Sequence, residues 1–207
     1  MNNTSVGKGR SLTVLLICSL LGLPLRAEAH STVEGLDEFV NGLIHPLFTP
    51  AHVLVLLAFG FWIGRHPPLR LRSPLPAFAL GTLVGLLFAW KGLVTQIPSP
   101  VLLVAAMVAA VAVATDFKIP LTIRVILTAL AGILLGMDSA PEAAITPGAV
   151  AKTLLGTWVG LYIWLVNPAF YISILPRKKW ADYAVRIAAS WIIAISFIVI
   201  AFAFSKR

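Results

Sequence analysis

Long apolar runs separated by short polar breaks set the strongest limit on how this chain can fold. Six such segments cover about residues 43–64, 75–91, 100–115, 119–136, 148–174 and 182–204. A transmembrane helix needs about 20 mostly apolar residues, and the third and fourth segments lie at the short end of that range. Only 12% of the residues are charged, about half the share in soluble domains, and the mean hydropathy is +0.94. The sequence therefore predicts an all-α membrane protein, a single bundle of about six transmembrane helices.

The first 29 residues have the composition of a cleaved secretory signal peptide. Lys8 and Arg10 precede an apolar run over residues 11–23, and Ala27-Glu28-Ala29 forms an A-x-A cleavage site. We expect residues 1–29 to be the signal peptide and residues 30–207 to form the six-span bundle, with an uncleaved anchor as the alternative. The single cysteine, Cys18, falls inside the signal peptide, so the mature chain would contain no disulfide and no thiolate metal site.

The cations predict the orientation of the bundle. A cleaved signal peptide and six spans place both mature termini on the outer, periplasmic side of a bacterial inner (plasma) membrane. The cytoplasmic ends would then carry nine cations, which are Arg65, Arg70, Arg72, Lys118, Arg124, Arg177, Lys178, Lys179 and Arg186. The outer ends would carry four, which are Lys91, Lys152, Lys206 and Arg207. This asymmetry follows the positive-inside rule.

The net charge of +8 does not indicate a nucleic-acid-binding protein. The cations flank apolar runs and form no basic stripe with interleaved aromatic residues. An enzyme is also not expected, because the chain has no nucleophile-plus-base arrangement, no Gly-rich phosphate loop and no paired intramembrane carboxylates. The lipid bilayer is the partner that the composition predicts.

Two histidines and two prolines at the start of the first apolar segment are the main functional signal. His45, Pro46, Pro50 and His52 lie within eight residues of one another. On a regular helix His45 and His52 would be about 10.5 Å apart along the axis, too far to share one ion, so a shared site requires that the prolines break the helix. An ordinary pair of interfacial histidines is the alternative.

Acidic residues concentrate on the same predicted outer side. Asp138 and Glu142 follow the fourth segment, and imidazole with carboxylate suits divalent nickel, copper, cobalt or zinc. We therefore expect a metal site that combines His45, His52, Asp138 and Glu142. Acidic outer loops are common in membrane proteins, and an ordinary acidic loop is the alternative.

Two further residues are weaker candidates. Cleavage after Ala29 would make His30 the N-terminal residue, whose amine and imidazole can chelate one metal ion. An interfacial helix over residues 30–42 without a metal site is the alternative. Asn167 precedes Pro168 within the fifth segment, where a proline frees a backbone carbonyl. Asn167 either satisfies that carbonyl or lines a passage for an ion.

The second, fourth and fifth segments each contain two glycines four residues apart. The pairs are Gly81/Gly85, Gly132/Gly136 and Gly156/Gly160. This spacing places both glycines on one face of a helix and allows close approach of a neighbouring helix in lipid. We expect these three helices to form the tightly packed centre of the bundle.

The chain resembles the HupE/UreJ family of membrane proteins, which are encoded with hydrogenase or urease genes and associated with nickel uptake. His45, Pro46 and His52 match the family motif His-Pro-x-x-Gly-x-Asp-His, in which Thr49 and Ala51 replace the glycine and the aspartate. Gly136 and Glu142 match a second motif, whose two histidines are replaced by Leu135 and Ser139. The resemblance implies an N-terminal signal peptide, about six spans and handling of a divalent metal ion.

Two functions remain open from the sequence. The first is a metal permease or metal-delivery accessory protein, in which the ion is the cargo and no resident cofactor is required. The second is a structural or assembly subunit of a metalloenzyme complex, or a partner of another membrane subunit, that has lost the path for the metal.

Overall fold

In the computed structural model, residues 35–66, 74–93, 97–139, 146–176 and 178–205 are described, and this part of the chain is all-helical. Its helices are α2 (Glu38–Phe48), α3 (Pro50–Gly64), α4 (Pro74–Trp90), α5 (Ser99–Thr115), α6 (Leu121–Met137), α7 (Pro147–Ile174) and α8 (Lys179–Ser205). The expected signal peptide lies outside the described residues.

The described helices differ in their ability to cross a membrane. Two of them, α7 with 28 residues and α8 with 27, are long and apolar enough to do so. The consecutive helices α2 and α3 pass the same test only together, and they are bent by 79° at their junction. The apolar helices α4, α5 and α6 have 17 residues each and are shorter than a typical span. The described chain therefore offers two candidate spans, or three if the bent pair counts as one, where the sequence predicted six.

The first apolar segment is not one continuous helix. The break is at Thr49, whose backbone is extended (φ −103°, ψ 106°). A residue before proline is driven out of the helical region by the proline ring, whereas Pro50 itself is well suited to begin a new helix. Residues 43–64 therefore form the end of α2 and all of α3, and the axes of these two helices point in different directions.

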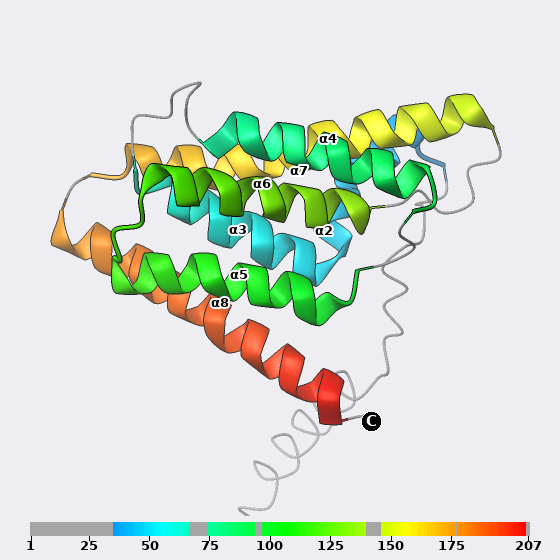
Figure 1. Cartoon of the computed structure of the whole chain (residues 1–207). Helices are drawn as coiled ribbons and strands as arrows, with labels where there is room; N and C mark the ends of the chain where they lie inside the picture. Colours follow the sequence, from blue (N-terminus) through cyan, green and yellow to red (C-terminus); the bar gives the residue numbers. More distant parts are fainter. Residues whose placement is uncertain (1–34, 67–73, 94–96, 140–145, 177, 206–207) are drawn as a thin grey trace, which may run out of the picture.

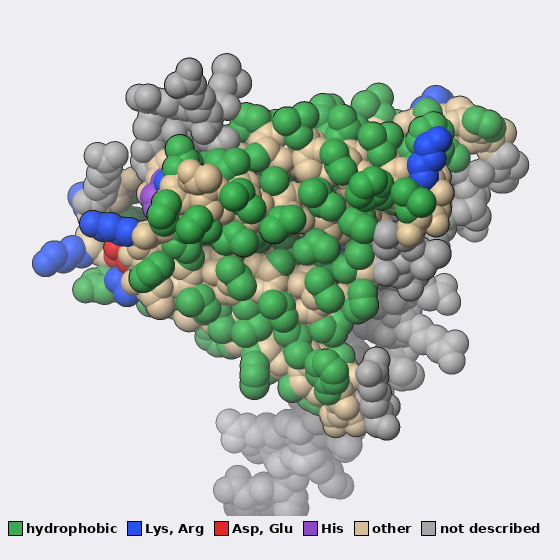
Figure 2. Space-filling view, in the orientation of Figure 1, with side chains coloured by type: hydrophobic (Ala, Val, Ile, Leu, Met, Phe, Trp, Pro, Cys, Tyr) green, Lys and Arg blue, Asp and Glu red, His purple; other side chains and the backbone are tan. Residues whose placement is uncertain are grey.

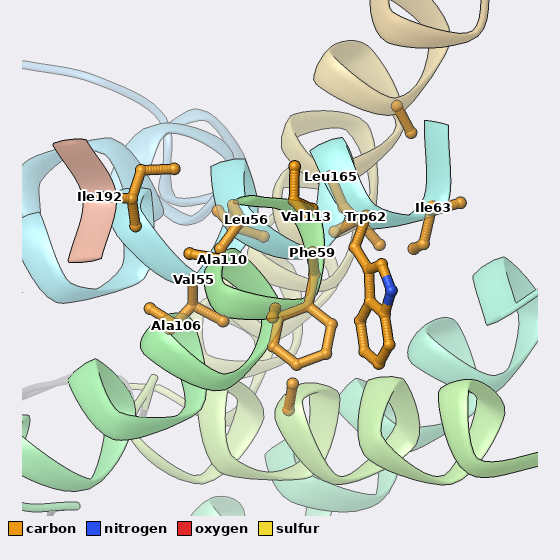
Figure 3. Close-up of a cluster of buried hydrophobic side chains, with 14 of the residues drawn as sticks. Val55, Leu56, Phe59, Trp62, Ile63, Ala106, Ala110, Val113, Leu165 and Ile192 are labelled. Carbon is orange, nitrogen blue, oxygen red and sulfur yellow. The ribbon is translucent and has the colours of Figure 1, made fainter. Parts of the chain in front are cut away.

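Helix α3 lies at the centre of the molecule. It packs mainly against α5 and α7 and also contacts α8, and Figure 1 shows it between α6 and α5. Its aromatic residues Phe59 and Trp62 are 2% and 1% exposed, and they pack with Val113 of α5 and Leu165 of α7 (Figure 3). The helices α4, α6 and α7, with their glycine pairs, were expected at this central position. Helix α3 occupies it instead, and its own glycines, Gly60 and Gly64, lie against α7 at Pro168 and Ala169.

The glycine pairs hold two peripheral helix pairs together. Gly85 of α4 and Gly136 of α6 face each other so closely that a Cβ added to either would lie 3.0 Å from the Cα of the other. Gly156 and Gly160 of α7 lie directly against the backbone of α2 at Phe39 and Leu43. The prediction that these glycines allow close helix packing is confirmed, and the pairs that they join are α4 with α6 and α2 with α7.

The outer surface of the helix bundle is largely apolar. Figure 2 shows hydrophobic side chains across the middle of one face and cationic side chains towards its two ends. Large exposed side chains include Leu80 of α4, Ile126 of α6 and Phe197 of α8, each more than half exposed. A contiguous apolar surface of this kind is suited to lipid rather than to water.

The glycine contact between α4 and α6 makes a direct prediction about stability. Replacement of Gly136 by alanine would place a Cβ against the carbonyl oxygen of Thr82 and 2.8 Å from the backbone nitrogen of Leu86. Because backbone atoms cannot move aside cheaply, Gly136→Ala should destabilise the protein by about 1–3 kcal/mol. Thermal unfolding in detergent measures this change. Gly148→Ala is the matched control, since nothing lies within 4 Å of its added Cβ, and an equal loss in both variants would contradict the packing argument.

Candidate functional site

The junction between α2 and α3 brings two histidines together. His45 lies in the last turn of α2, and His52 is the third residue of α3. Because the chain turns at Thr49, the centroids of the two imidazole rings are 5.8 Å apart in an edge-to-face arrangement. A straight helix would have separated these residues by about 10.5 Å along its axis.

His52 is completely buried and makes a specific polar contact. Its Nε2 lies 2.9 Å from Oδ2 of Asp138, the residue that ends α6. The other carboxylate oxygen, Oδ1, accepts a hydrogen bond of 2.9 Å from the backbone N–H of Ile97, just before α5. Asp138 therefore joins the start of α3, the end of α6 and the segment before α5.

The second ring nitrogen of His52 has a different environment. Nδ1 is buried and has no hydrogen-bond partner among the described residues. An ionised carboxylate only accepts hydrogen bonds, so Asp138 favours the tautomer that carries the proton on Nε2. That tautomer leaves a lone pair on Nδ1, which is the form of imidazole that binds a metal ion.

The other predicted site residues are placed differently. Glu142 and His30 lie outside the described residues. Asn167 is on an exposed part of α7, where it lines a groove of about 270 Å³ with the apolar side chains of Leu47, Leu57 and Trp164. The structure therefore brings His45, His52 and Asp138 together at one end of the bundle and places Asn167 on an exposed apolar surface.

The described part of the chain contains no group of three or more His, Cys, Asp or Glu side chains that could by itself hold a metal ion. One nitrogen of His52 is already engaged by Asp138. Two imidazoles, one of them oriented by a carboxylate, are what the described residues contribute to a ligand set.

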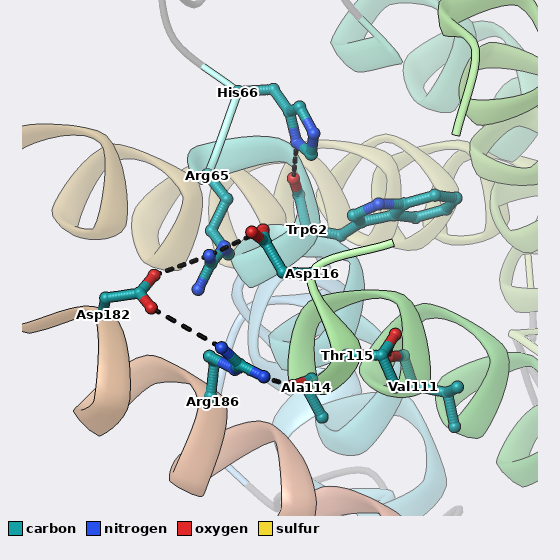
Figure 4. A network of polar contacts seen from close by, with 9 residues as sticks. All are labelled: Trp62, Arg65, His66, Val111, Ala114, Thr115, Asp116, Asp182 and Arg186. Atoms are coloured by element: carbon teal, nitrogen blue, oxygen red, sulfur yellow. Dashed lines mark hydrogen bonds and ion pairs between the residues drawn. The ribbon is translucent and has the colours of Figure 1, made fainter. Parts of the chain in front are cut away.

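A second polar cluster lies at the opposite end of α3, and sequence reasoning did not identify it. Arg65, which ends α3, forms ion pairs of 2.8 Å with Asp116 and 2.6 Å with Asp182 (Figure 4). Arg186 lies 3.9 Å from Asp182 and donates a hydrogen bond of 2.7 Å to the carbonyl of Ala114. Among the described residues, Asp116 and Asp182 are the only acidic side chains at this cation-rich end. Two acidic residues among many cations were the signal that the sequence offered.

A comparison with models of protein families tests the resemblance that the His45–His52 motif suggested. The model of the HupE/UreJ proteins matches residues 18–199. The chain belongs to the HupE/UreJ family. Its members are membrane accessory or transport proteins, and the apolar helices described above agree with a membrane location. Searches of the curated proteins and of the solved structures gave no match.

The contacts of Asp138 predict its contribution to stability. Asp138→Ala would leave the Nε2–H of His52 and the backbone N–H of Ile97 without their acceptors in a buried position. The expected cost is about 1–3 kcal/mol in the free energy of unfolding, measured by denaturation in detergent. The control is Glu38→Gln, which affects only an exposed 3.9 Å ion pair with Lys152 and should change stability by less than about 0.5 kcal/mol. Equal stability of Asp138→Ala and wild type would contradict the role of this carboxylate.

The lowered pKa of His66, at the cation-rich end, leads us to expect that stability depends on pH. Partial desolvation of the ring, together with the nearby charges of Arg124 and Arg65, lowers the pKa of His66 below its usual 6.5, against the opposing hydrogen bond from its ring to the carbonyl of Trp62. The unfolded chain therefore binds a proton on His66 at a higher pH than the folded chain does. The contribution of neutral His66 to stability is complete above about pH 6.5, and it is lost as the pH falls through the lowered pKa. Thermal unfolding between about pH 7 and 5 should show a smaller decline for His66→Gln than for the wild type. Parallel declines would show that His66 does not contribute.

Proposed function

We propose that this protein handles a divalent transition-metal ion, as a permease or a metal-delivery accessory protein, through the site at the α2–α3 junction. The observation that carries the proposal is the fully buried His52, which is held by Asp138 through one nitrogen and stacked edge-to-face against His45. Carboxylates that hydrogen-bond a metal-binding imidazole fix its orientation and raise its basicity. Asp138 is placed to perform that function for Nδ1 of His52.

The proposed ligands are Nδ1 of His52, the ring of His45 and the carboxylate of Glu142. Glu142 follows Asp138 by four residues in the sequence, and Asp138 lies beside the imidazole of His52. Nitrogen ligands with one carboxylate favour nickel, cobalt, copper or zinc over magnesium or calcium. The ion is the cargo in this proposal and would be captured from the outer, periplasmic side.

The proposed orientation follows from the charges at the two ends of α3. The end with Arg65, Arg124 and Arg186 would face the cytoplasm, and the end with His52 and Asp138 would face outwards. Cations near the ends of spans are retained on the cytoplasmic side. The six-span topology and the cleaved signal peptide belong to the same proposal.

A second candidate, an accessory subunit without an ion path, is favoured by one observation. Between His52 and Arg65 the centre of the molecule is filled by apolar side chains, including Phe59 and Trp62. The buried hydroxyl groups in the described helices are few, one each on α4, α6, α7 and α8, at Thr82, Thr128, Thr157 and Ser196. An ion crossing the bundle would need ligands at intervals through this region.

Metal accumulation in cells tests the proposal. His45→Ala and His52→Ala should both reduce the uptake of nickel, cobalt, copper or zinc, and Asp138→Asn should weaken the apparent affinity about 10–100-fold, because the imidazole then loses its orienting carboxylate. His66→Gln is the matched control, since it removes a histidine from the opposite end of α3. Immunoblotting of membranes must show equal amounts of each variant.

The same experiment separates the two candidates. Uptake that depends on His45 and His52 but not on His66 supports a permease. If wild-type protein moves none of these metals, and a metalloenzyme fails to assemble in cells that lack the protein, the accessory subunit is the correct function.

A further inference from the structure

A large cavity lies at the cation-rich end of the molecule, away from the histidine site. Its volume is about 840 Å³, and it lies between the ends of α3 and α7 and the beginnings of α6 and α8. The lining includes five cationic side chains, which are Arg65, Arg124, Lys178, Lys179 and Arg186. A volume of this size is within the range of small-molecule binding sites, about 300–1,000 Å³.

The cations of this cavity are not balanced by acidic residues. Arg65 and Arg186 share Asp182, and Arg65 also contacts Asp116. The other three cations, Arg124, Lys178 and Lys179, have no ion-pair partner in the described ranges. Two carboxylates therefore face five cations, and the cavity has a strong preference for an anion.

Buried guanidinium groups without acceptors, first that of Arg124, support this preference for an anion. The Nε of Arg124 is buried and has no hydrogen-bond acceptor among the residues that the structure describes. The same is true of one terminal nitrogen of Arg65, whose side chain is only 13% exposed. Buried guanidinium N–H groups normally find an acceptor, and a phosphate group matches their planar arrangement of donors.

The surroundings of the cavity indicate where the anion comes from. The wall contains apolar side chains, including Ile172, Leu175 and Val185, as well as the cations. At its rim the aromatic side chains of Trp180 and Tyr183 are about 60% exposed at the start of α8, a position typical of the membrane–water interface. Basic pockets between membrane helices with such surroundings bind the headgroups of anionic lipids.

We infer that this cavity binds the phosphate of an anionic membrane lipid, with Arg124, Lys178 and Lys179 as its main cationic contacts. The lipid's glycerol and upper acyl chains would lie against the apolar wall, and its phosphate would accept hydrogen bonds from the guanidinium groups. Arg65 and Arg186 would stay engaged with Asp182 and hold α3 and α8 in place around the headgroup.

Lipid binding to the purified full chain tests the inference. Native mass spectrometry compares the retention of phosphatidylglycerol, which is anionic, with that of phosphatidylcholine, which carries no net charge. The wild type should retain phosphatidylglycerol preferentially, and Lys178→Gln/Lys179→Gln should weaken that binding by about tenfold or more, since each cation near a phosphate contributes about a fivefold factor. Both lysines are exposed, so this variant should fold normally. Arg124→Gln, which removes one cation, should weaken the binding by about fivefold.

Two controls make the outcome decisive. Lys91→Gln removes an exposed cation beside Trp90, outside the cavity, and should leave lipid retention unchanged. Inorganic phosphate is the competitor that distinguishes a lipid headgroup from a free anion, and it should not displace the lipid. Equal retention of both lipids, equal losses in Lys91→Gln and the cavity variants, or displacement by inorganic phosphate would each overturn the inference.

Discussion

Helix α3 is apolar on every side, and a helix of that kind has to be enclosed by others. Its 15 residues span about 22 Å, and polar contacts are made at its two ends. His52 meets Asp138 at one end, and Arg65 meets Asp116 and Asp182 at the other. These contacts fix α3 relative to α6, α5 and α8, because sliding the helix along its axis would break a polar contact at one end or the other. The apolar centre provides the driving force for packing, and the polar ends set the position.

Much of the architecture could be predicted from the sequence, because the signals are local. Five of the six apolar segments match the helices α4 to α8 to within a few residues, whereas the first segment is divided between α2 and α3. The glycine spacing predicted the close-packing faces. The prolines on either side of Thr49 indicated that His45 and His52 would meet only if the helix broke there, and the rings are 5.8 Å apart. Asp138 was proposed because the predicted topology places it on the same side as the two histidines.

The remaining features depend on contacts between distant parts of the chain. The sequence did not indicate that α3 would be central, because its hydropathy is like that of its neighbours and only packing distinguishes an enclosed helix from a peripheral one. Nor did it indicate that Asn167 would face an apolar groove, since the orientation of a residue on an apolar helix is set by its neighbours. The ion pairs of Arg65 join residues 51 and 117 positions apart, which no spacing rule predicts.

The single extended residue between α2 and α3 also makes the geometry of the histidine pair depend on the rest of the molecule. Both α2 and α3 pack on α7 through glycine contacts, and α3 also packs on α5, so the angle between the two helices is set by these neighbours. His45 is four residues from Thr49, so a rotation of α2 about this pivot by about 10° would move its backbone by about 1 Å. Metal–ligand distances tolerate changes of only about 0.2 Å. A small change in the angle between α2 and α3 at Thr49 would therefore be enough to open or close the space between the two imidazoles.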